Sequence, residues 1–518
     1  MTDLGATFKA SVEREPHALA LVDGPLRLTY AQWQPRIADA ANSLRRLGVR
    51  PGDRVLTVLQ NGEPMCSTYW ACQLLGATIV PVNWRLSEGE LTYIAHDAEP
   101  RCAVVDANSP SAQRAVSDLP AIGIRGAGKA AASDAFESRA GQDVLSGAEL
   151  TEPLEERTPS IMLYTSGTTG RPKGVPRTHL AERAAAIAHI AQNAYRRNEV
   201  TLGVMPLYHT MGIRSLIAMT LLNGTYVAMA RWEPRLALEL IERERVSNLY
   251  LAPTLYYDLL ALPRSDARDL RTLRKIGYAG APMTPTLVER CYERFAPDVF
   301  VNHYGSTEIY TFTISSDPRR KPGCVGRAGL NERVRIVPIG SRDAEAGCAP
   351  REVGEIIVDM NSPEAFAGYW RRPDADARSI AGGWYYTGDT GMFDEDGELF
   401  VMGRVDDMIV TGGENVYPVE VEDALARCDA VGRIAVIGLP DERLGEKIVA
   451  FVEPARSGVT AEELEAFAGS CGMTQFKRPR EFIFVRKIPQ SASGKVLRTK
   501  LRAGEYERLE VSGMLLET

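Results

Sequence analysis

The sequence predicts an α/β protein with a large N-terminal domain of several subdomains and a small C-terminal α+β domain. Its 518 residues are too many for one simple core. Buried-strand and helical patterns alternate over the first part of the chain, as they do in units that build parallel-rich sheets. Near residue 390 this alternation gives way to hairpin and strand patterns. We therefore expect an N-terminal domain over residues 1–404 and a C-terminal domain over residues 405–518.

The first strand–helix–strand unit is expected within residues 54–83. The segments RVLTVLQN (54–61) and GATIVPVN (76–83) are typical of buried strands, and EPMCSTYWACQLL (63–75) has the apolar spacing of a helix. The two strands should be parallel, with the helix covering the sheet. Residues 108–158 are rich in alanine, serine, glycine and charge and have weak periodicity, so we expect a variable connecting region there.

A short apolar run followed by a polar loop with glycine then recurs along the chain. It occurs in SIMLYTSGTTG, LGVMPLYHTMG, LRKIGYAGAPM and VFVNHYGSTE. In open α/β sheets, ligands bind beyond the carboxyl ends of the strands. We therefore expect several of these loops to converge on one site.

The C-terminal part begins with a predicted hairpin. The segment GMFDEDGELFVMGR places Asp396 and Gly397 at a turn between two strands. A strand-rich stretch, AVGRIAVIGLPDERLGEKIVAFVEP, follows, and a capping box from Thr460 to Glu463 then opens a helix. These signals indicate a small α+β domain after a boundary near Arg404–Asp407.

Composition excludes several classes of function. The net charge of −7 gives no electrostatic support for nucleic-acid binding. The eight cysteines are scattered without a C-x-x-C pair, which argues against a structural zinc site and fits a reducing compartment. No run of about 18 apolar residues occurs, so no membrane span is predicted. The N-terminal segment lacks the pattern of a leader, and we expect the protein in the cytoplasm.

The loop YTSGTTGRPKGV (164–175) has the composition of a phosphate-binding segment. Its glycines let backbone N–H groups face a phosphate, and Lys173 adds a mobile cation. The loop is expected to follow the strand SIMLY and to precede the helical segment AERAAAIAHIAQNAY, whose N-terminus would add positive potential. Its spacing differs from the P-loop pattern G-x-x-x-x-G-K-[ST]. A flexible surface turn is the alternative interpretation.

The full twelve-residue string resembles the phosphate-loop signature of the adenylate-forming enzymes. These are the acyl-CoA synthetases, the carrier-loading adenylation domains and the firefly-type luciferases. Further segments with counterparts in that family follow in the family's order: YGSTE (304–308), YYTGD (385–389), GRVDDMIVTGGENVYPVEVED (403–423) and IPQSASGKVLR (488–498). From Leu273 onward the sequence is most similar to the 4-chlorobenzoate–CoA ligase branch of aryl-CoA ligases. The resemblance implies an ATP-dependent carboxylate–CoA ligase whose C-terminal domain is mobile.

The resemblance also implies an ATP site. Glu308 would bind Mg²⁺, Thr307 would contact the α-phosphate, and Asp389 would accept hydrogen bonds from the ribose with Arg404 as its partner. Tyr304 would lie against the adenine, although plain core packing is its alternative role. The loop residues expected to hold the β- and γ-phosphates are Thr165, Ser166, Gly167, Thr168, Thr169, Gly170 and Lys173.

The C-terminal motifs imply the second half of the site. Lys495 matches the family's adenylation lysine, which bridges the substrate carboxylate and the AMP phosphate. Asp406 falls at the hinge position about which the C-terminal domain rotates between two half-reactions. Coenzyme A would reach the site along a tunnel beside Gly412 and Gly413, and its nucleotide would be bound near Phe476 and Arg478. Leu444 replaces a tryptophan that stacks on the CoA adenine in the chlorobenzoate-type ligases.

The acid pocket is expected to be lined by His209, Ala279, Gly280, Ala281, His303 and Tyr310. His209 would gate the pocket or lie beside the carboxylate, and a satisfied core histidine is its alternative. His303 replaces an apolar residue of the chlorobenzoate branch and could bond to a hydroxyl or ring heteroatom, unless it points away. We therefore predict a small aromatic or heteroaromatic acid of the benzoate, hydroxybenzoate, halobenzoate or furoate type.

Other functions share part of this pattern. A medium-chain fatty acyl-CoA synthetase and a stand-alone adenylation enzyme that loads a carrier protein are the closest alternatives. A luciferase-type oxygenase needs the same first half-reaction, and a catalytically silent binding protein is a further class. Intact Lys495, Glu308 and Asp389 argue against the silent class. No G-x-S-x-G or H-E-x-x-H motif supports a hydrolase. A homodimer is compatible with the sequence.

Overall fold

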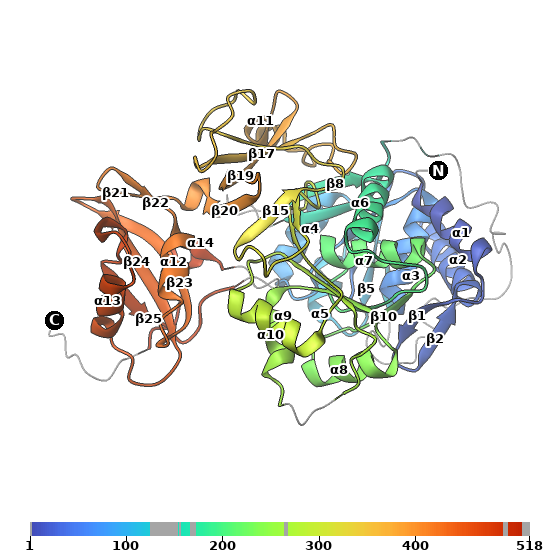
Figure 1. Ribbon diagram of the computed structural model, residues 1–518. Helices are drawn as coiled ribbons and strands as arrows, with labels where there is room; N and C mark the ends of the chain where they lie inside the picture. The colour runs from blue at the N-terminus through green and yellow to red at the C-terminus, as the bar shows by residue number, and fades with distance from the viewer. Residues whose placement is uncertain are drawn as a thin grey trace. The chain divides into compact units, whose positions relative to one another are not determined.

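The computed structural model describes residues 3–124, 154, 157–165, 172–263, 268–490 and 496–509. Within it the chain forms two compact units (Figure 1). The first unit comprises Met1–Val334 and Asp359–Gly383, and the second comprises Arg335–Val358 and Trp384–Thr518. Both contain helices and strands, which confirms the predicted α/β class. This division differs from the predicted one at residues 404 and 405, because residues 384–404 group with the C-terminal part; the predicted boundary stays a prediction.

The chain leaves the first unit after Val334 and returns at Asp359. Two contacts join these points. The Asp359 N–H donates to the Arg333 carbonyl at 3.0 Å, and the Arg333 guanidinium lies 3.0 Å from the Asp359 carboxylate. The segment of residues 335–358 therefore leaves the first unit and returns to it at neighbouring positions.

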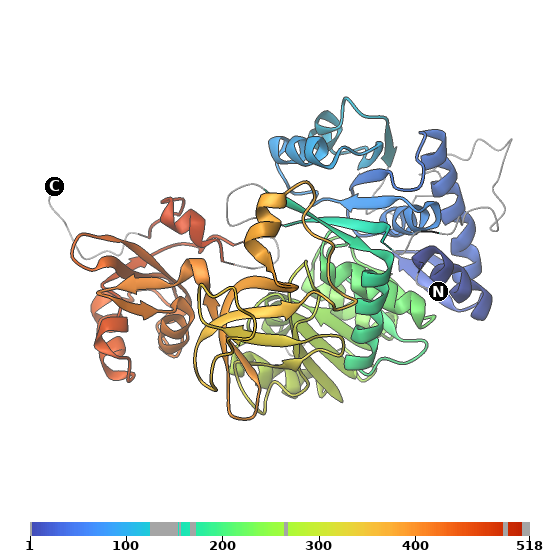
Figure 2. The ribbon, with the colours of Figure 1, turned by 90° about the horizontal axis from the view of Figure 1, so that it is seen from above.

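One sheet of the first unit holds the predicted strand–helix–strand unit. The strands β3 and β4 are parallel, and α3 connects them with the bounds that the apolar spacing predicts. Figure 2 shows the blue strands of this sheet beside the teal hairpin β7–β8. In spatial order the strands are β6 (Ala121–Ile124), β5 (Cys102–Asp106), β3 (Arg54–Val58), β4 (Thr78–Pro81), β7 (Pro159–Thr165) and β8 (Lys173–Thr178).

The connecting region predicted over residues 108–158 is more regular at its start than expected. Helix α5 covers Pro110–Ala115, and β6 pairs in parallel with β5. Both elements are short, and β6 is partly exposed at the sheet edge, so their apolar periodicity in the sequence is weak. The first part of the predicted connecting region therefore contains a helix and a strand.

A second sheet of the first unit carries most of the predicted site loops. Its central strands β1, β10, β9, β11, β12 and β13 are joined by parallel pairing. In spatial order the strands are β15 (Cys324–Ala328), β14 (Thr313–Ser315), β13 (Val299–Tyr304), β12 (Lys275–Ala279), β11 (Asn248–Leu251), β9 (Val200–Gly203), β10 (Thr225–Ala228), β1 (Leu19–Asp23) and β2 (Leu26–Thr29).

Helices pack on both sheets, and their buried side chains form part of the hydrophobic cores. The rings of Phe8 and Trp70 lie 5.1 Å apart, and the buried Trp33 donates from its indole to Ser67 at 2.9 Å. The helices of the first unit are α1 (Leu4–Arg14), α2 (Tyr30–Arg46), α3 (Glu63–Leu75), α4 (Glu88–Ala98), α5 (Pro110–Ala115), α6 (His179–Gln192), α7 (Thr210–Leu221), α8 (Pro234–Arg243), α9 (Pro253–Ala261), α10 (Pro285–Phe295) and α11 (Pro373–Ser379).

The second unit contains the predicted hairpin and the predicted α+β arrangement. Strands β19 and β20 are antiparallel, and Gly397 adopts a φ of 73° in the turn between them. The side-chain hydroxyl of Thr460 accepts a hydrogen bond from the Glu463 N–H, as the predicted helix cap requires. Strands β16 (Val334–Val337), β17 (Gly354–Asp359), β19 (Trp384–Phe393) and β20 (Leu399–Arg404) lie in this order.

A further sheet of the second unit runs β22–β21–β24–β23, and β25 pairs with β24. Its elements are β21 (Ile409–Thr411), β22 (Glu414–Val416), β23 (Val431–Asp441), β24 (Gly445–Pro454), β25 (Glu481–Phe484), α12 (Pro418–Leu425), α13 (Ala461–Ser470) and α14 (Arg498–Arg502). Within the described ranges of the whole chain, no helix combines the length and the apolar character that a membrane span requires.

Candidate active site

The carboxyl ends of neighbouring parallel strands carry several of the predicted site residues. Ala279 ends β12 and is paired in register with His303 near the end of β13. His209 follows β9 and caps the N-terminus of α7. The three loops therefore share one edge of the sheet, as the recurring strand–loop pattern predicts.

The hairpin β7–β8 carries the phosphate-loop signature. Thr165 and Lys173 are register partners at the end of the hairpin where the loop connects the two strands. Ser166, Gly167, Thr168, Thr169 and Gly170 lie outside the described residues, so their predicted role stays a prediction. The expected helix does not follow the loop directly. Strand β8 intervenes because residues 173–178 pair with β7, and α6 begins at His179 with Thr178 as its N-cap.

The Glu308 carboxylate is held by a residue that we did not predict. Glu308 is 7% exposed, and the Tyr369 hydroxyl donates to its Oε1 at 2.7 Å. The Phe366 N–H donates to the Glu308 carbonyl at 2.9 Å, so the segment around Tyr369 also fixes the backbone. The ring of Tyr304 packs edge-on against Phe312, with the centroids 5.2 Å apart.

The same tyrosine contacts the cation at the end of the phosphate hairpin. Lys173 Nζ lies 4.0 Å from the centroid of the Tyr369 ring, a distance typical of a cation–π contact. Tyr369 therefore contacts both residues. Its ring face lies against Lys173, and its hydroxyl donates to Glu308. The aromatic pair beside Gly368 in the sequence, Tyr369-Trp370, was the only signal that could have indicated it.

Arg177 is a second residue that sequence reasoning missed. It lies on β8, is fully buried, and pairs with Glu182 at 2.5 Å. Its Nη1 donates to the Glu308 carbonyl at 2.9 Å and to the Glu364 carbonyl at 2.8 Å, and lies 3.3 Å from the Thr307 carbonyl. The guanidinium thus joins the phosphate hairpin to the YGSTE loop. The sequence signal that could have indicated this role is a basic residue, Arg177, within the pattern of a buried strand.

The pocket residue His303 lies in a buried polar cluster. It is 1% exposed, its Nε2 lies 3.0 Å from the Asn193 amide nitrogen, and its Nδ1 lies 3.5 Å from the Thr311 hydroxyl. Arg214 donates to Thr311 at 2.5 Å and also to the hydroxyl of Tyr250. Burial and the Arg214 charge hold the pKa of His303 well below its usual value, so the ring is neutral at physiological pH.

Two other predicted pocket residues have defined surroundings. Burial, with a smaller contribution from Arg214, lowers the pKa of His209 to about 4, and its Nδ1 accepts a hydrogen bond from the Met211 N–H at 3.4 Å. Tyr310 donates to Glu182 at 3.1 Å, and the Arg177 guanidinium stacks 3.6 Å from its ring centroid. Tyr310 is thus part of the ion-pair network rather than a free wall of a pocket. Gly280 has a φ of 87° and is exposed, and Ala281 is half-buried.

In the second unit, Asp389 and Arg404 form the predicted pair. They face each other across β19 and β20 at 2.7 Å, and Arg404 Nη1 also donates to the Thr387 carbonyl at 3.0 Å. Gly388 adopts a φ of 71°, and a side-chain carbon there would lie 2.8 Å from Arg404 Nη2. Glycine is therefore needed between Thr387 and Asp389 both for its backbone conformation and for space.

The predicted hinge residue and the predicted catalytic lysine lie close in the sequence to residues with defined contacts. Asp406 is exposed in a short 3₁₀ turn, Val405–Asp407, whereas Asp407 pairs with Arg502 at 3.1 Å. Lys495 lies outside the described residues. On either side of its segment, Gln490 and Val496 pair as an antiparallel bridge.

The residues predicted for CoA have mixed surroundings. Gly412 and Gly413 form the turn between β21 and β22, with φ values of 61° and 86°. Phe476 packs on the core of the second unit. Arg478 donates from Nε to the Met473 carbonyl at 3.1 Å, so the protein already engages part of the guanidinium expected to bind a nucleotide.

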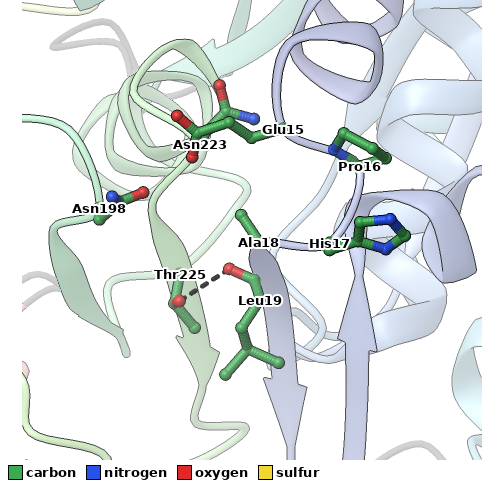
Figure 3. Close-up of a pocket in the computed structure, with 8 residues that line it drawn as sticks. All are labelled: Glu15, Pro16, His17, Ala18, Leu19, Asn198, Asn223 and Thr225. Carbon is green, nitrogen blue, oxygen red and sulfur yellow. Dashed lines mark hydrogen bonds between the residues drawn. The ribbon is translucent and has the colours of Figure 1, made fainter.

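A surface cavity of about 550 Å³ lies elsewhere in the first unit. Figure 3 shows it between the end of α1 and β10, where Thr225 donates to the Leu19 carbonyl at 2.8 Å. Its lining residues are Glu15, Pro16, His17, Ala18, Leu19, Asn198, Asn223 and Thr225. None of them is a residue predicted to bind ATP, acid or CoA, so we assign this cavity no part in the site.

The donor set around Glu308 fits a nucleotide-borne metal ion. In the part of the chain that the structure describes, no cluster of three or more histidine, cysteine, aspartate or glutamate side chains is arranged to hold a metal. Mg²⁺ bound mainly to phosphate oxygens and water needs few protein carboxylates. One buried carboxylate with an oriented side chain meets that need.

Comparisons with known proteins decide the family. The family model described as AMP-binding enzyme matches residues 8–370, and the model of the AMP-binding enzyme C-terminal domain matches residues 420–495. The chain belongs to the AMP-binding enzyme family. It is an α/β enzyme of the acid–thiol ligase class, and the aryl-CoA ligase branch is among its relatives.

Curated relatives of this AMP-binding enzyme span different acids. A feruloyl-CoA synthase of Amycolatopsis sp is 35% identical over 96% of the chain and 98% of that protein. A 4-chlorobenzoate–CoA ligase of Pseudomonas sp. is 33% identical over 95% of the chain and 93% of that protein. A long-chain-fatty-acid–CoA ligase of Mycobacterium tuberculosis is 31% identical over 97% and 98%.

A solved structure extends the likeness to the fold. The o-succinylbenzoate CoA synthetase from Bacillus subtilis, in complex with its acyl-adenylate intermediate, matches with a TM-score of 0.84 and 26% identity. The match covers 96% of this AMP-binding enzyme and 97% of that chain.

Proposed function

We propose that the protein is an AMP-forming carboxylate–CoA ligase for a small aromatic or heteroaromatic acid. The observation that carries the choice of acid is the polar cluster of His303, Thr311 and Arg214 behind the carboxyl ends of β12 and β13. A long alkyl chain gains nothing from buried polar groups, whereas a ring hydroxyl or heteroatom can bond to them. Feruloyl, chlorobenzoyl and succinylbenzoyl relatives are consistent with a ring-bearing acid.

The proposed first half-reaction forms an acyl-adenylate. A carboxylate oxygen of the acid attacks the α-phosphorus of ATP, and pyrophosphate leaves. Thr307 and the phosphate loop with Lys173 would orient the triphosphate, and Lys495 would neutralise the acid's carboxylate beside the α-phosphate. When bound, Mg²⁺ would offset phosphate charge, with Glu308 as its protein ligand. Asp389 and Arg404 would orient the ribose.

The proposed second half-reaction forms the thioester. The CoA thiol loses its proton, its sulfur attacks the acyl carbonyl carbon, and AMP leaves with the bonding electrons. Rotation about Asp406 would replace Lys495 by the Gly412–Gly413 turn at the reacting centre. Arg478 keeps nitrogen atoms that could contact CoA phosphate, but its Nε is used within the protein.

Two alternatives remain within the same reaction class. A fatty acid is favoured by the long-chain relative, and a carrier protein could replace CoA as the thiol acceptor. The cytoplasmic location and a homodimer stay predictions.

A panel of acids tests the proposal. Pyrophosphate release would be measured with benzoate, 4-hydroxybenzoate, 4-chlorobenzoate, 2-furoate, ferulate, octanoate and palmitate, with CoA present and product masses recorded. We expect the highest kcat/KM for a ring-bearing acid with a polar substituent. A His303→Leu variant should shift the ratio of 4-hydroxybenzoate to 4-chlorobenzoate turnover toward the chloro acid by about tenfold, the value of one buried hydrogen bond. Preference of the unaltered enzyme for octanoate or palmitate would overturn the aromatic assignment.

A further inference from the structure

We propose that Tyr369 is a positioning residue that orients the Glu308 carboxylate for its metal ion and braces Lys173 for the phosphates. The inference rests on the proposed function for the roles of Glu308 and of the phosphate hairpin. It adds a residue, from a segment outside the recognised motifs, that links the two.

The Tyr369 side chain is fixed on several sides. It is 6% exposed, and its ring packs edge-on against Phe366 with the centroids 5.0 Å apart. Its backbone N–H donates to the Asp376 carboxylate at 2.8 Å. Gly368 has a φ of 112°, and a side-chain carbon there would lie 3.1 Å from the same carboxylate, so this turn admits little change.

The hydroxyl of Tyr369 acts on one oxygen of Glu308. A glutamate side chain has three rotatable bonds. Ordering these bonds each time a metal ion binds costs conformational entropy, which weakens the affinity for the metal ion. The 2.7 Å bond to Oε1 selects one orientation of the carboxylate. Because a phenol is a neutral donor, this bond brings no positive charge to the carboxylate. An arginine or lysine in the same place would cancel the charge that attracts the metal ion.

The ring face of Tyr369 acts on Lys173. Lys173 Nζ lies 4.0 Å from the ring centroid, where the negative face of the ring attracts the ammonium. Lys173 begins β8 at the base of the phosphate loop. One buried side chain therefore sets the position of a cation for the phosphates and of an anion for the metal ion that the phosphates carry.

Two variants separate the actions of the hydroxyl and the ring. Tyr369→Phe removes the hydroxyl and keeps the ring, and Tyr369→Leu removes both. Tyr30→Phe is the matched control, because the Tyr30 hydroxyl is also buried and bonded, at 2.9 Å to the Gly224 carbonyl, but Tyr30 lies on α2 away from the motifs. ATP binding to the full chain without acid would be measured by calorimetry, once with Mg²⁺ and once with excess EDTA, and Tm would confirm folding.

We expect Tyr369→Phe to weaken ATP binding about tenfold with Mg²⁺ and not in EDTA, because one hydrogen bond to a charged ligand group is lost. Tyr369→Leu should weaken ATP binding in both conditions, and Tyr30→Phe in neither. Equal loss with and without Mg²⁺ in Tyr369→Phe, or no loss, would overturn the inference. Mg²⁺-independent ATP binding by the unaltered protein would instead contradict the proposed metal role of Glu308, and the inference with it.

Discussion

Arg177 Nε lies 2.5 Å from the Glu182 carboxylate, and neither side chain is exposed to solvent. Burial alone lowers the pKa of a guanidinium, yet the Glu182 carboxylate and the other acceptors around Arg177 raise its pKa above its usual value. The guanidinium therefore keeps its charge although it is buried. Its Nη1 donates to the backbone carbonyls of Glu308, in the YGSTE loop, and of Glu364.

Replacing Arg177 should unfold the first unit more easily. Arg177→Met leaves the Glu182 charge buried without its partner, which typically costs about 3–5 kcal/mol. Chemical denaturation would measure the loss. The double variant Arg177→Met with Glu182→Leu should recover part of it, because no buried charge remains. Arg114→Ala, at an exposed pair with Glu88, is the control and should change stability by less than about 0.5 kcal/mol. A single variant as stable as the control would contradict the importance of the pair.

A side chain at Gly388 should impair nucleotide binding through Arg404. Gly388→Ala adds a carbon 2.8 Å from Arg404 Nη2, so the guanidinium must move away from Asp389. The KM for ATP should rise about tenfold, as for one lost charged hydrogen bond. Gly397→Ala is matched in backbone conformation, with a φ of 73°, but has no atom within 4 Å of the added carbon. Both variants should lose about 1 kcal/mol of stability. A normal KM in Gly388→Ala would show that Arg404 does not act on ATP.

Stability should fall with rising pH because of Glu332. Burial, with a smaller contribution from the Glu364 charge, raises the pKa of Glu332 to about 8. The folded state therefore binds a proton that the unfolded chain has released, and this contribution is complete in acid and is lost as the pH rises through about 8. The loss between about pH 5 and pH 8 is at most about 5 kcal/mol. Denaturation of Glu332→Gln should show a flatter pH profile, whereas Glu293→Gln, at an exposed site, should retain the original slope.

Removal of the tail lysine should separate the two half-reactions. Lys495→Ala should abolish acyl-adenylate formation, because the cation between carboxylate and phosphate is lost. Thioester formation from supplied acyl-adenylate and CoA should continue at a similar rate. Lys487→Ala removes an exposed lysine of the same unit and should affect neither step. Pyrophosphate release at the normal rate from Lys495→Ala would refute the assignment.

Parts of the fold could be predicted because the local sequence pattern and the tertiary contacts favour the same structure there. The helix at residues 63–75 has apolar residues at helical spacing, is bounded by glycine on both sides, and is buried along its whole length. The hairpin at Asp396–Gly397 has both alternating strands and a turn glycine. At these places no competing structure satisfies the backbone equally well.

Other parts depend on contacts that no local pattern encodes. We expected the phosphate loop to precede a helix and predicted no strand between them, yet pairing with β7 makes residues 173–178 a strand. The roles of Arg177 and Tyr369 arise from contacts to residues 131 and 61 positions away in the chain. His303 could be identified by its type, but its partners Asn193 and Thr311 come from other elements.

The contacts between Arg333 and Asp359 have a practical meaning for protein engineering. Where a chain departs from a compact body and re-enters it at adjoining points, the intervening segment can be exchanged with little effect on the body that it leaves. A chimera could therefore take residues 335–358 and 384–518 from a relative while keeping the remainder. Such a hybrid would take the β7–β8 hairpin and the sheet edge with His209 and His303 from one parent, and the Asp389–Arg404 pair and Lys495 from the other. The two crossovers flanking residues 359–383 would be the places to make the cuts.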